Sequence, residues 1–283
     1  MVQTTTICIC GAGTMGSGIA QVSAQSGFNT ILFDVNVHVL EKAKESIQKN
    51  LETLIGRQKI TADEKEKIYR QITFVNVIGN CIADVVIEAI VEKMDAKVSL
   101  FDQLAAINDG QTLFATNTSS LSVSDIQKNS LFPQRVVGMH FFNPAYAMKL
   151  VEVVKGDQTS DDVAQAIYEL CKQLGKLPVM CKDAPGFIVN RVARQYYLEA
   201  MTLVEKGIAT FENIDAIMEA SGFKMGPFKL MDLIGMDINL SVSQSIYEAF
   251  KKAERLKPSE LQVAKVKAHE LGRKTGKGFY NYE

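Results

Sequence analysis

The stretch TTICICGAGTMGSGIAQVSA, residues 5–24, decides the fold of this chain. Its first part is a β-rich run, and the residues after the glycines have the composition of a helix. Between them, Gly11, Gly13 and Gly16 fit the spacing G-x-G-x-x-G. The first glycine allows a tight turn, the second lets a pyrophosphate approach the backbone, and the third lets helix and strand pack closely. We therefore predict a dinucleotide-binding turn, with Thr14 and Met15 at the helix start, where N–H groups hold phosphates.

An acidic residue follows at the distance that this turn requires. A second β-rich run, residues 29–33, ends in Asp34, 18 positions beyond Gly16 (34 − 16). A carboxylate there hydrogen-bonds the ribose hydroxyls of NAD and repels the extra phosphate of NADP, and no arginine follows at positions 35–37. A glycine-rich turn that binds nothing is the alternative, but it leaves Asp34 unexplained. We therefore predict NAD as the cofactor.

Strand-like and helical runs then alternate along the chain. Strands are expected at residues 72–77, 84–90, 112–115, 135–142, 150–154 and 177–181, and helices at residues 39–54, 95–107, 122–128 and 161–174. This alternation is typical of the α/β class with a Rossmann-like, doubly wound, mostly parallel sheet. From Pro185 the pattern is helical, at residues 189–205, 211–220, 231–250 and 260–271. We predict an NAD-binding domain over residues 1–184 and a second, smaller all-helical domain for substrate binding and dimerisation over residues 185–283.

The totals are those of an ordinary globular protein. With 283 residues, of which 47% are hydrophobic and 22% charged, the chain can form a sizeable core. A formal net charge of −1 provides no overall attraction to nucleic acid or to an anionic membrane. The five cysteines lack the C-x-x-C spacing of a zinc or redox site, so no metal is expected. The absence of a signal-like start and of a long apolar run favours a cytoplasmic protein.

A second stretch, VVGMHFFNPAYAMKLVEVV at residues 136–154, contains a histidine and a glutamate that are suited to proton transfer. Its pattern indicates a strand, a turn at Asn143-Pro144 and another strand. His140 ends the first run and Glu152 lies in the second, 12 positions later (152 − 140), so their side chains can meet. A carboxylate on the far nitrogen of an imidazole fixes its tautomer and stabilises its charged form. A histidine packed in the core of a strand is the alternative from this stretch alone.

Polar residues gather where three of the predicted strands end. They are Glu88, Glu92 and Lys93 after one strand, Asn117 to Ser120 after the next, and His140 and Asn143 after the third. Ligands bind at the carboxyl ends of the strands in doubly wound sheets, so we expect these side chains to converge on one crevice. The Asn-Thr-Ser-Ser run also suits a turn and helix cap before Ser122.

Seven short segments extend this pattern over essentially the whole chain. In order they are GAGTMGSGIAQ, IEAIVE, ATNTSSL, GMHFFNPAYAMKLVEVV, DAPGFIVNR, GPFKLMDLIGMD and GRKTGKGFYNY. Together they make the chain similar to the 3-hydroxyacyl-CoA dehydrogenases, above all to the short bacterial 3-hydroxybutyryl-CoA dehydrogenases. The resemblance implies an acyl-CoA substrate, such as acetoacetyl-CoA or 3-hydroxybutyryl-CoA, and a homodimer formed through the helical domain.

The same resemblance implies roles for individual residues. His140 would be the catalytic base and Glu152 its partner, with Ser119 and Asn190 close to the substrate oxygens. Residues expected near the ligands are Glu92, Lys93 and Asn117 at the nicotinamide, and Lys49, Arg57 and Lys59 in the region that contacts CoA.

The predicted reaction is the reversible oxidation of a short-chain (S)-3-hydroxyacyl-CoA to the 3-ketoacyl-CoA with NAD. Two alternatives remain open: a dehydrogenase of the same architecture that acts on a sugar acid, and a non-catalytic NAD-binding dimer. A protein that only binds NAD has no use for the set Ser119, His140, Glu152 and Asn190, which argues against the second alternative.

Overall fold

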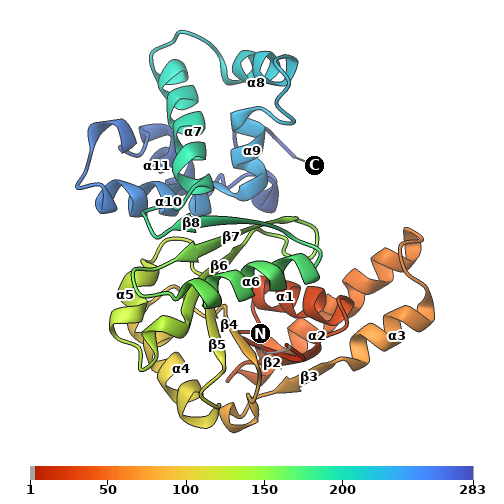
Figure 1. Cartoon of the computed structure of the whole chain (residues 1–283). Helices are drawn as coiled ribbons and strands as arrows, with labels where there is room; N and C mark the ends of the chain where they lie inside the picture. Colours follow the sequence, from red (N-terminus) through yellow and green to blue (C-terminus); the bar gives the residue numbers. More distant parts are fainter. Residues whose placement is uncertain (1–3, 283) are drawn as a thin grey trace. The chain divides into compact units, whose positions relative to one another are not determined.

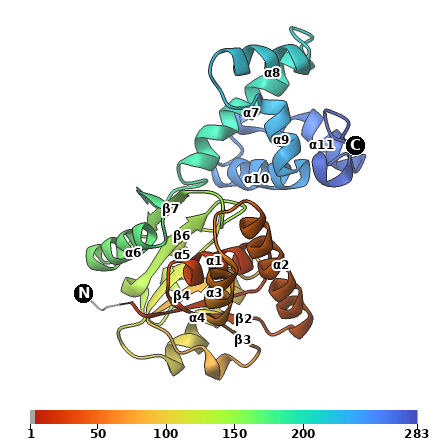
Figure 2. The same ribbon diagram turned by 90° about the vertical axis from the view of Figure 1, so that its right-hand side faces the viewer.

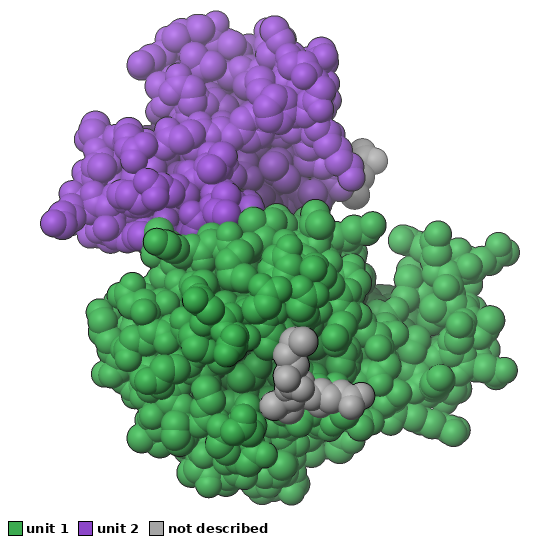
Figure 3. All heavy atoms as spheres, viewed as in Figure 1, with its two compact units in different colours: residues 1–184 green, residues 185–283 purple. Residues whose placement is uncertain are grey.

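The structure, a computed structural model, describes residues 4–282 and consists of two compact units. The first unit comprises Met1–Ala184 and the second Pro185–Glu283 (Figure 3). Buried apolar side chains form separate clusters in the two units. Within residues 4–282, none of the helices combines the length and the apolar character needed to cross a membrane.

The first unit is built on one eight-stranded sheet (Figure 1). Its strands are β1 Thr6–Cys10, β2 Asn29–Phe33, β3 Ile72–Val75, β4 Val85–Glu88, β5 Leu113–Thr116, β6 Val136–Phe141, β7 Leu150–Lys155 and β8 Leu177–Lys182. They lie in the order β3-β2-β1-β4-β5-β6-β7-β8, and every neighbouring pair is parallel except β6 and β7. The order reverses between β1 and β4, where a doubly wound sheet binds its ligand. The predicted fold class is confirmed.

Helices cover both faces of this sheet (Figures 1 and 2). They are α1 Thr14–Gln25, α2 Val37–Gly56, α3 Ala62–Arg70, α4 Met94–Ile107, α5 Val123–Lys128 and α6 Asp161–Gln173. Residues of α1, α2 and α6 are buried in the core on one face, and residues of α4 and α5 in the core on the other. Strand β1 contributes to both, because Ile7 and Ile9 point to the first core and Cys8 and Cys10 to the second. Such a strand is apolar on both faces, as parallel strands are.

The second unit is helical. Its helices are α7 Val189–Glu205, α8 Phe211–Ala220, α9 Pro227–Ile234, α10 Met236–Ala249 and α11 Glu260–Lys267. The helix predicted over residues 231–250 is wrong, because Gly235 has a φ of 103° and separates α9 from α10. The helix predicted over residues 260–271 is too long, because α11 ends at Lys267 and His269 adopts a positive φ of 58°.

Candidate active site

The glycines of the first loop are required by close backbone contacts. A Cβ atom at Gly16 would lie 1.7 Å from the carbonyl oxygen of Gly11, so no larger residue fits between β1 and α1. Gly11 has a φ of +102°, and a Cβ atom there would lie 2.5 Å from the carbonyl oxygen of Ala89. A Cβ atom at Gly13 would meet nothing within 4 Å, which leaves room for a ligand beside the backbone. The geometry at the three positions is therefore the one that the motif requires.

The start of α1 suits a phosphate. Gly13 is the N-cap of this helix, and no side chain caps the backbone N–H groups that follow at Thr14 and Met15. Such N–H groups carry partial positive charge and bind anions. Next to the loop lies a pocket of about 750 Å³, which is large enough for a nucleoside. Its lining includes Gly11, Gly13, Asp34 and the segment from Ala89 to Val91.

Asp34 follows β2 at the edge of this pocket. Its Oδ2 accepts a hydrogen bond of 2.9 Å from the backbone N–H of Ala12, and its Oδ1 accepts one of 2.9 Å from that of Asn36. These two bonds fix the carboxylate between the glycine loop and the start of α2. A carboxylate has further lone pairs, so Asp34 can also accept hydrogen bonds from a ribose.

His140 and Glu152 lie directly opposite each other on β6 and β7. The Nδ1 atom of His140 is 2.7 Å from Oε2 of Glu152, and the two residues are 6% and 1% exposed. This contact fixes which ring nitrogen of His140 faces the carboxylate of Glu152. The ring centroid of Phe142 lies 4.6 Å from that of His140 and limits the orientation of the imidazole.

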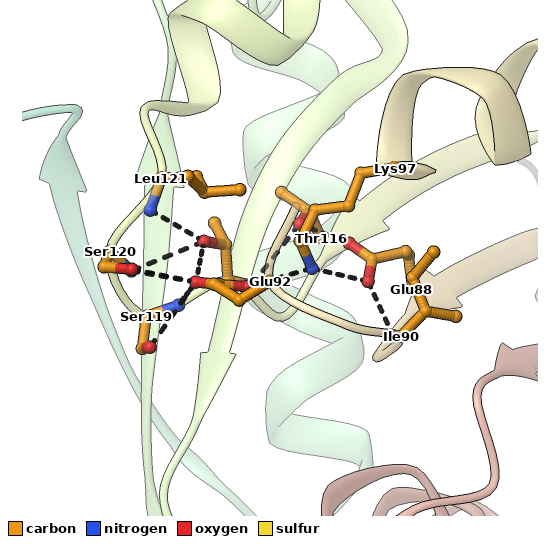
Figure 4. Close-up of polar contacts among 9 residues, drawn as sticks. Glu88, Ile90, Glu92, Lys97, Thr116, Ser119, Ser120 and Leu121 are labelled. Carbon is orange, nitrogen blue, oxygen red and sulfur yellow. Dashed lines mark hydrogen bonds and ion pairs between the residues drawn. The ribbon is translucent and has the colours of Figure 1, made fainter. Parts of the chain in front are cut away.

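Glu92 organises the loop that follows β5 (Figure 4). Its Oε1 accepts hydrogen bonds from the backbone N–H groups of Ser119, at 2.9 Å, and Ser120, at 3.2 Å. The hydroxyl groups of Thr118 and Ser120 donate to the same oxygen. One carboxylate oxygen therefore fixes the segment that presents Ser119.

Lys97, which was not among the residues predicted for the site, forms an ion pair with this carboxylate. Its Nζ atom lies 3.1 Å from Oε2 of Glu92 and 2.6 Å from Oε1 of Glu88, and Figure 4 shows it between the two side chains. Glu88, at the end of β4, also accepts hydrogen bonds of 2.7 Å from Thr116 Oγ1 and from the backbone N–H of Ile90. Lys93, the lysine predicted for the site, lies exposed at the N-cap of α4.

The sequence does contain a signal for Lys97. It lies in α4 in line with Leu100, Phe101 and Leu104, all of which are buried, so it occupies the apolar face of the helix. A lysine is almost never fully buried unless it is paired. A lysine in an apolar helical stripe close to two glutamates therefore predicts a buried ion pair.

The pKa values of the two glutamates in this network are shifted in opposite directions. Burial raises the pKa of Glu88 above its ordinary range, in spite of the nearby charge of Lys97. Burial would also raise the pKa of Glu92, but the charge of Lys97 and the hydrogen bonds from Thr118 and Ser119 outweigh it and lower the pKa. Glu92 is therefore ionised near neutral pH.

Two asparagines lie just beyond the carboxyl ends of β5 and β6. The side-chain oxygen of Asn117 accepts a hydrogen bond of 2.9 Å from the backbone N–H of Phe141, which links the end of β5 to that of β6. Asn143 is joined to Pro144 by a cis peptide bond, in the connection between β6 and β7. Asn143 and Pro144 line a second pocket of about 210 Å³, together with Thr14, Ser17, Gly18, Ser46, Asn50 and Tyr146.

The remaining predicted residues lie elsewhere. Lys49, Arg57 and Lys59 are exposed on the hairpin of α2 and α3, which extends from the sheet in Figure 1. Within residues 4–282, none of the three forms an ion pair with an acidic side chain. Asn190 lies in the first turn of α7, in the second unit. Its predicted place close to the substrate oxygens stays a prediction.

Comparison with known proteins agrees with these features. Residues 6–184 match the NAD binding domain of 3-hydroxyacyl-CoA dehydrogenase, and residues 186–282 match the C-terminal domain of the same family. A probable 3-hydroxybutyryl-CoA dehydrogenase of Deinococcus radiodurans is 40% identical over 97% of this chain and 99% of its own length. The crystal structure of (S)-3-hydroxybutyryl-CoA dehydrogenase from Ralstonia eutropha superposes with a TM-score of 0.94 at 37% identity, covering 99% of this chain and 100% of that one.

A longer relative also matches. The 3-hydroxyadipyl-CoA dehydrogenase of Escherichia coli K12 is 43% identical over 100% of this chain, which spans only 60% of that protein.

The sheet, the glycine loop and Asp34 define an NAD-binding protein of the Rossmann-like class. Within that class, the chain belongs to the 3-hydroxyacyl-CoA dehydrogenase family.

Proposed function

We propose that this chain interconverts a short-chain (S)-3-hydroxyacyl-CoA and its 3-ketoacyl-CoA with NAD, and that the four-carbon pair is the preferred substrate. The observation that carries the proposal is the contact of 2.7 Å between His140 Nδ1 and Glu152 Oε2. It lies near the carboxyl end of β6, in the sheet that also holds the glycine loop. The names of the relatives from Deinococcus radiodurans and Ralstonia eutropha support the four-carbon substrate.

NAD fits the residues that are present. The open space beside Gly13, the start of α1 and the pocket at Asp34 suit the pyrophosphate and the adenosine. When bound, NAD supplies the acceptor for the hydride that leaves the hydroxyl-bearing carbon. The chain then has to bind the substrate and move one proton.

His140 performs the proton transfer in this proposal. Its Nε2 takes the proton of the substrate hydroxyl during oxidation and returns a proton to the carbonyl oxygen during reduction. Glu152 holds the Nδ1 proton and stabilises the imidazolium, because a buried carboxylate next to a cation is worth more than one in water. Such a base contributes about 10²- to 10⁴-fold to the rate.

Ser119 and Asn190 are proposed to hydrogen-bond the substrate oxygens. Ser119 is suited to this role because Glu92 fixes its backbone through the N–H group. A group that is held in place needs little reorganisation when charge develops on the substrate. Lys49, Arg57 and Lys59 would bind the phosphates of CoA, and their lack of ion pairs in the described part of the chain supports this.

The test is to mix the purified protein with NADH and acetoacetyl-CoA and to follow the absorbance of NADH. We expect oxidation of NADH by the native chain. His140→Gln should lose at least about 10²-fold in kcat and still bind NADH, because the imidazole serves the proton transfer and does not line the pocket beside the glycine loop. A native chain that binds NADH but leaves the thioester unreduced, while reducing a free keto acid, would favour the sugar-acid alternative.

The homodimer and the cytoplasmic location stay predictions. Apolar side chains that are more than half exposed support the dimer, among them Val192 at 68%, Ile208 at 65% and Ile217 at 65% in the second unit. Light scattering on the purified chain tests it, and a monomer at micromolar concentration would contradict it.

A further inference from the structure

Three buried cysteines meet on the face of the sheet that α4 covers. Cys8 and Cys10 are two positions apart on β1, so their side chains point to the same face. Cys81 follows the short 3-10 turn Ile78–Asn80 and joins the same core. The three sulfur atoms lie within 4.8 Å of one another, and those of Cys8 and Cys10 are 3.8 Å apart. All three residues are 0% exposed.

The position of Cys81 is fixed from outside the cluster. The side chain of Asn108, at the end of α4, donates a hydrogen bond of 2.9 Å to the carbonyl oxygen of Cys81. It accepts another of 2.9 Å from the backbone N–H of Ala83. The loop therefore presents its sulfur to β1 without help from a ligand, and the arrangement is preformed.

We propose that Cys8, Cys10 and Cys81 form a binding site for a soft monovalent metal ion of the Cu(I) class. A metal–sulfur bond is about 2.3 Å long, so three sulfurs around one ion in a plane lie about 4.0 Å from one another. The separation of 3.8 Å between Cys8 and Cys10 already fits this value. Since no pair exceeds 4.8 Å, the third sulfur needs to move by less than about 1 Å.

The number and kind of ligands favour Cu(I) over Zn²⁺. Structural zinc sites almost always have four ligands, whereas this cluster has three and no exposed surface through which water could supply a fourth. Soft thiolates select Cu(I), which accepts sulfur ligands alone. No His, Asp or Glu within residues 4–282 joins the three cysteines as a further ligand.

The charge of the cluster does not oppose binding. A Cu(I) ion that replaces the proton of one thiol, with the other two sulfur atoms as further ligands, releases one H⁺ for one Cu⁺. The net charge in the apolar core is then unchanged, which matters because burying additional charge is costly. No electron is transferred in this exchange.

The sequence predicted no metal site because the cysteines do not form a recognisable motif. Cys81 lies 71 positions after Cys10 (81 − 10), and only the pairing of β1 with β4 brings the segment before β4 next to β1. The proposed site is separate from the proposed reaction, since neither His140 nor Glu92 takes part in it.

The test uses the whole chain produced in cells grown with added copper. After purification without oxygen and washing with excess chelator, we expect about one copper ion per chain, with a sulfur-only environment in X-ray absorption. Cys81→Ala and, separately, Cys10→Val should each lose most of this copper. Cys171→Ala is the matched control, because Cys171 is equally buried but lies on α6, and it should retain the copper.

Binding of NADH by each variant shows that it is folded. The proposal is overturned if the washed native chain contains no copper. It is also overturned if folded Cys81→Ala and Cys10→Val keep as much copper as the native chain, or if Cys171→Ala loses it.

Discussion

Replacing Lys97 by Met should destabilise the first unit strongly while preserving the size of the side chain. Lys97 is 1% exposed, and its ammonium group is 2.6 Å from Glu88 and 3.1 Å from Glu92. Glu88 is 0% exposed, so its carboxylate cannot turn to solvent when its partner is removed. Removing one member of a buried pair costs about 3–5 kcal/mol, because a buried charge is left uncompensated. We expect a loss of this size in the free energy of unfolding.

The loss should depend on pH with a defined sign. Burial already raises the pKa of Glu88, and removal of the nearby cation raises it further. The folded variant then binds this proton more tightly than the unfolded chain does. Its stability is therefore highest at low pH and falls as the pH rises through the interval between the ordinary and the raised pKa. One such group changes the stability by at most about 1.4 kcal/mol per pH unit.

Urea denaturation at pH 6 and pH 8 measures both effects. Lys93→Met is the matched control for stability, because Lys93 is exposed one turn earlier, and it should change the unfolding free energy by less than about 0.5 kcal/mol. The double variant Lys97→Met, Glu88→Gln removes both buried charges and should recover much of the lost stability. A loss below about 1 kcal/mol in Lys97→Met, or a variant that is more stable at pH 8, would refute the reasoning.

Gly16→Ala should weaken NADH binding at least about tenfold, because its Cβ atom would displace the carbonyl of Gly11, and fluorescence titration measures this. Unchanged affinity would contradict the tight packing of the loop. Asp34→Ala should lower the preference for NADH over NADPH about tenfold or more in kcat/KM, since a charged acceptor worth about 1.5–3 kcal/mol is lost. Glu152→Gln should reduce kcat about 10²-fold or more with little change in NADH affinity; equal turnover would exclude its proposed role.

The sequence was sufficient for the fold because its signals are local. The glycine loop, the alternation of strands with helices and the change to a helical pattern at Pro185 each depend on neighbouring residues. Errors occurred where one backbone conformation overrides a continuous apolar pattern. Gly235, with a φ of 103°, divides a segment whose side chains alone predict one helix. Periodicity describes which face is buried, and it does not report such a local reversal.

The site was only partly accessible from the sequence. The lysine at the predicted position, Lys93, lies exposed, whereas Lys97 binds both glutamates. The apolar stripe of α4 indicates which of the two lysines is buried, but which glutamates it meets depends on how α4 packs against the sheet, and this is a tertiary property. The cluster of Cys8, Cys10 and Cys81 likewise depends on strand order, which no short motif encodes.

The contact between His140 and Glu152 depends on the one antiparallel pair in the sheet. Because β7 runs opposite to β6, its early residue Glu152 lies beside the late residue His140. A parallel β7 would begin beside the start of β6. A residue near the end of β7, such as Lys155, would then lie next to the histidine. A lysine there would disfavour the imidazolium that proton abstraction creates, whereas a carboxylate favours it. The reversal of one strand therefore decides the electrostatic character of the proposed base, and the short connection through Asn143 and Pro144 makes that reversal possible.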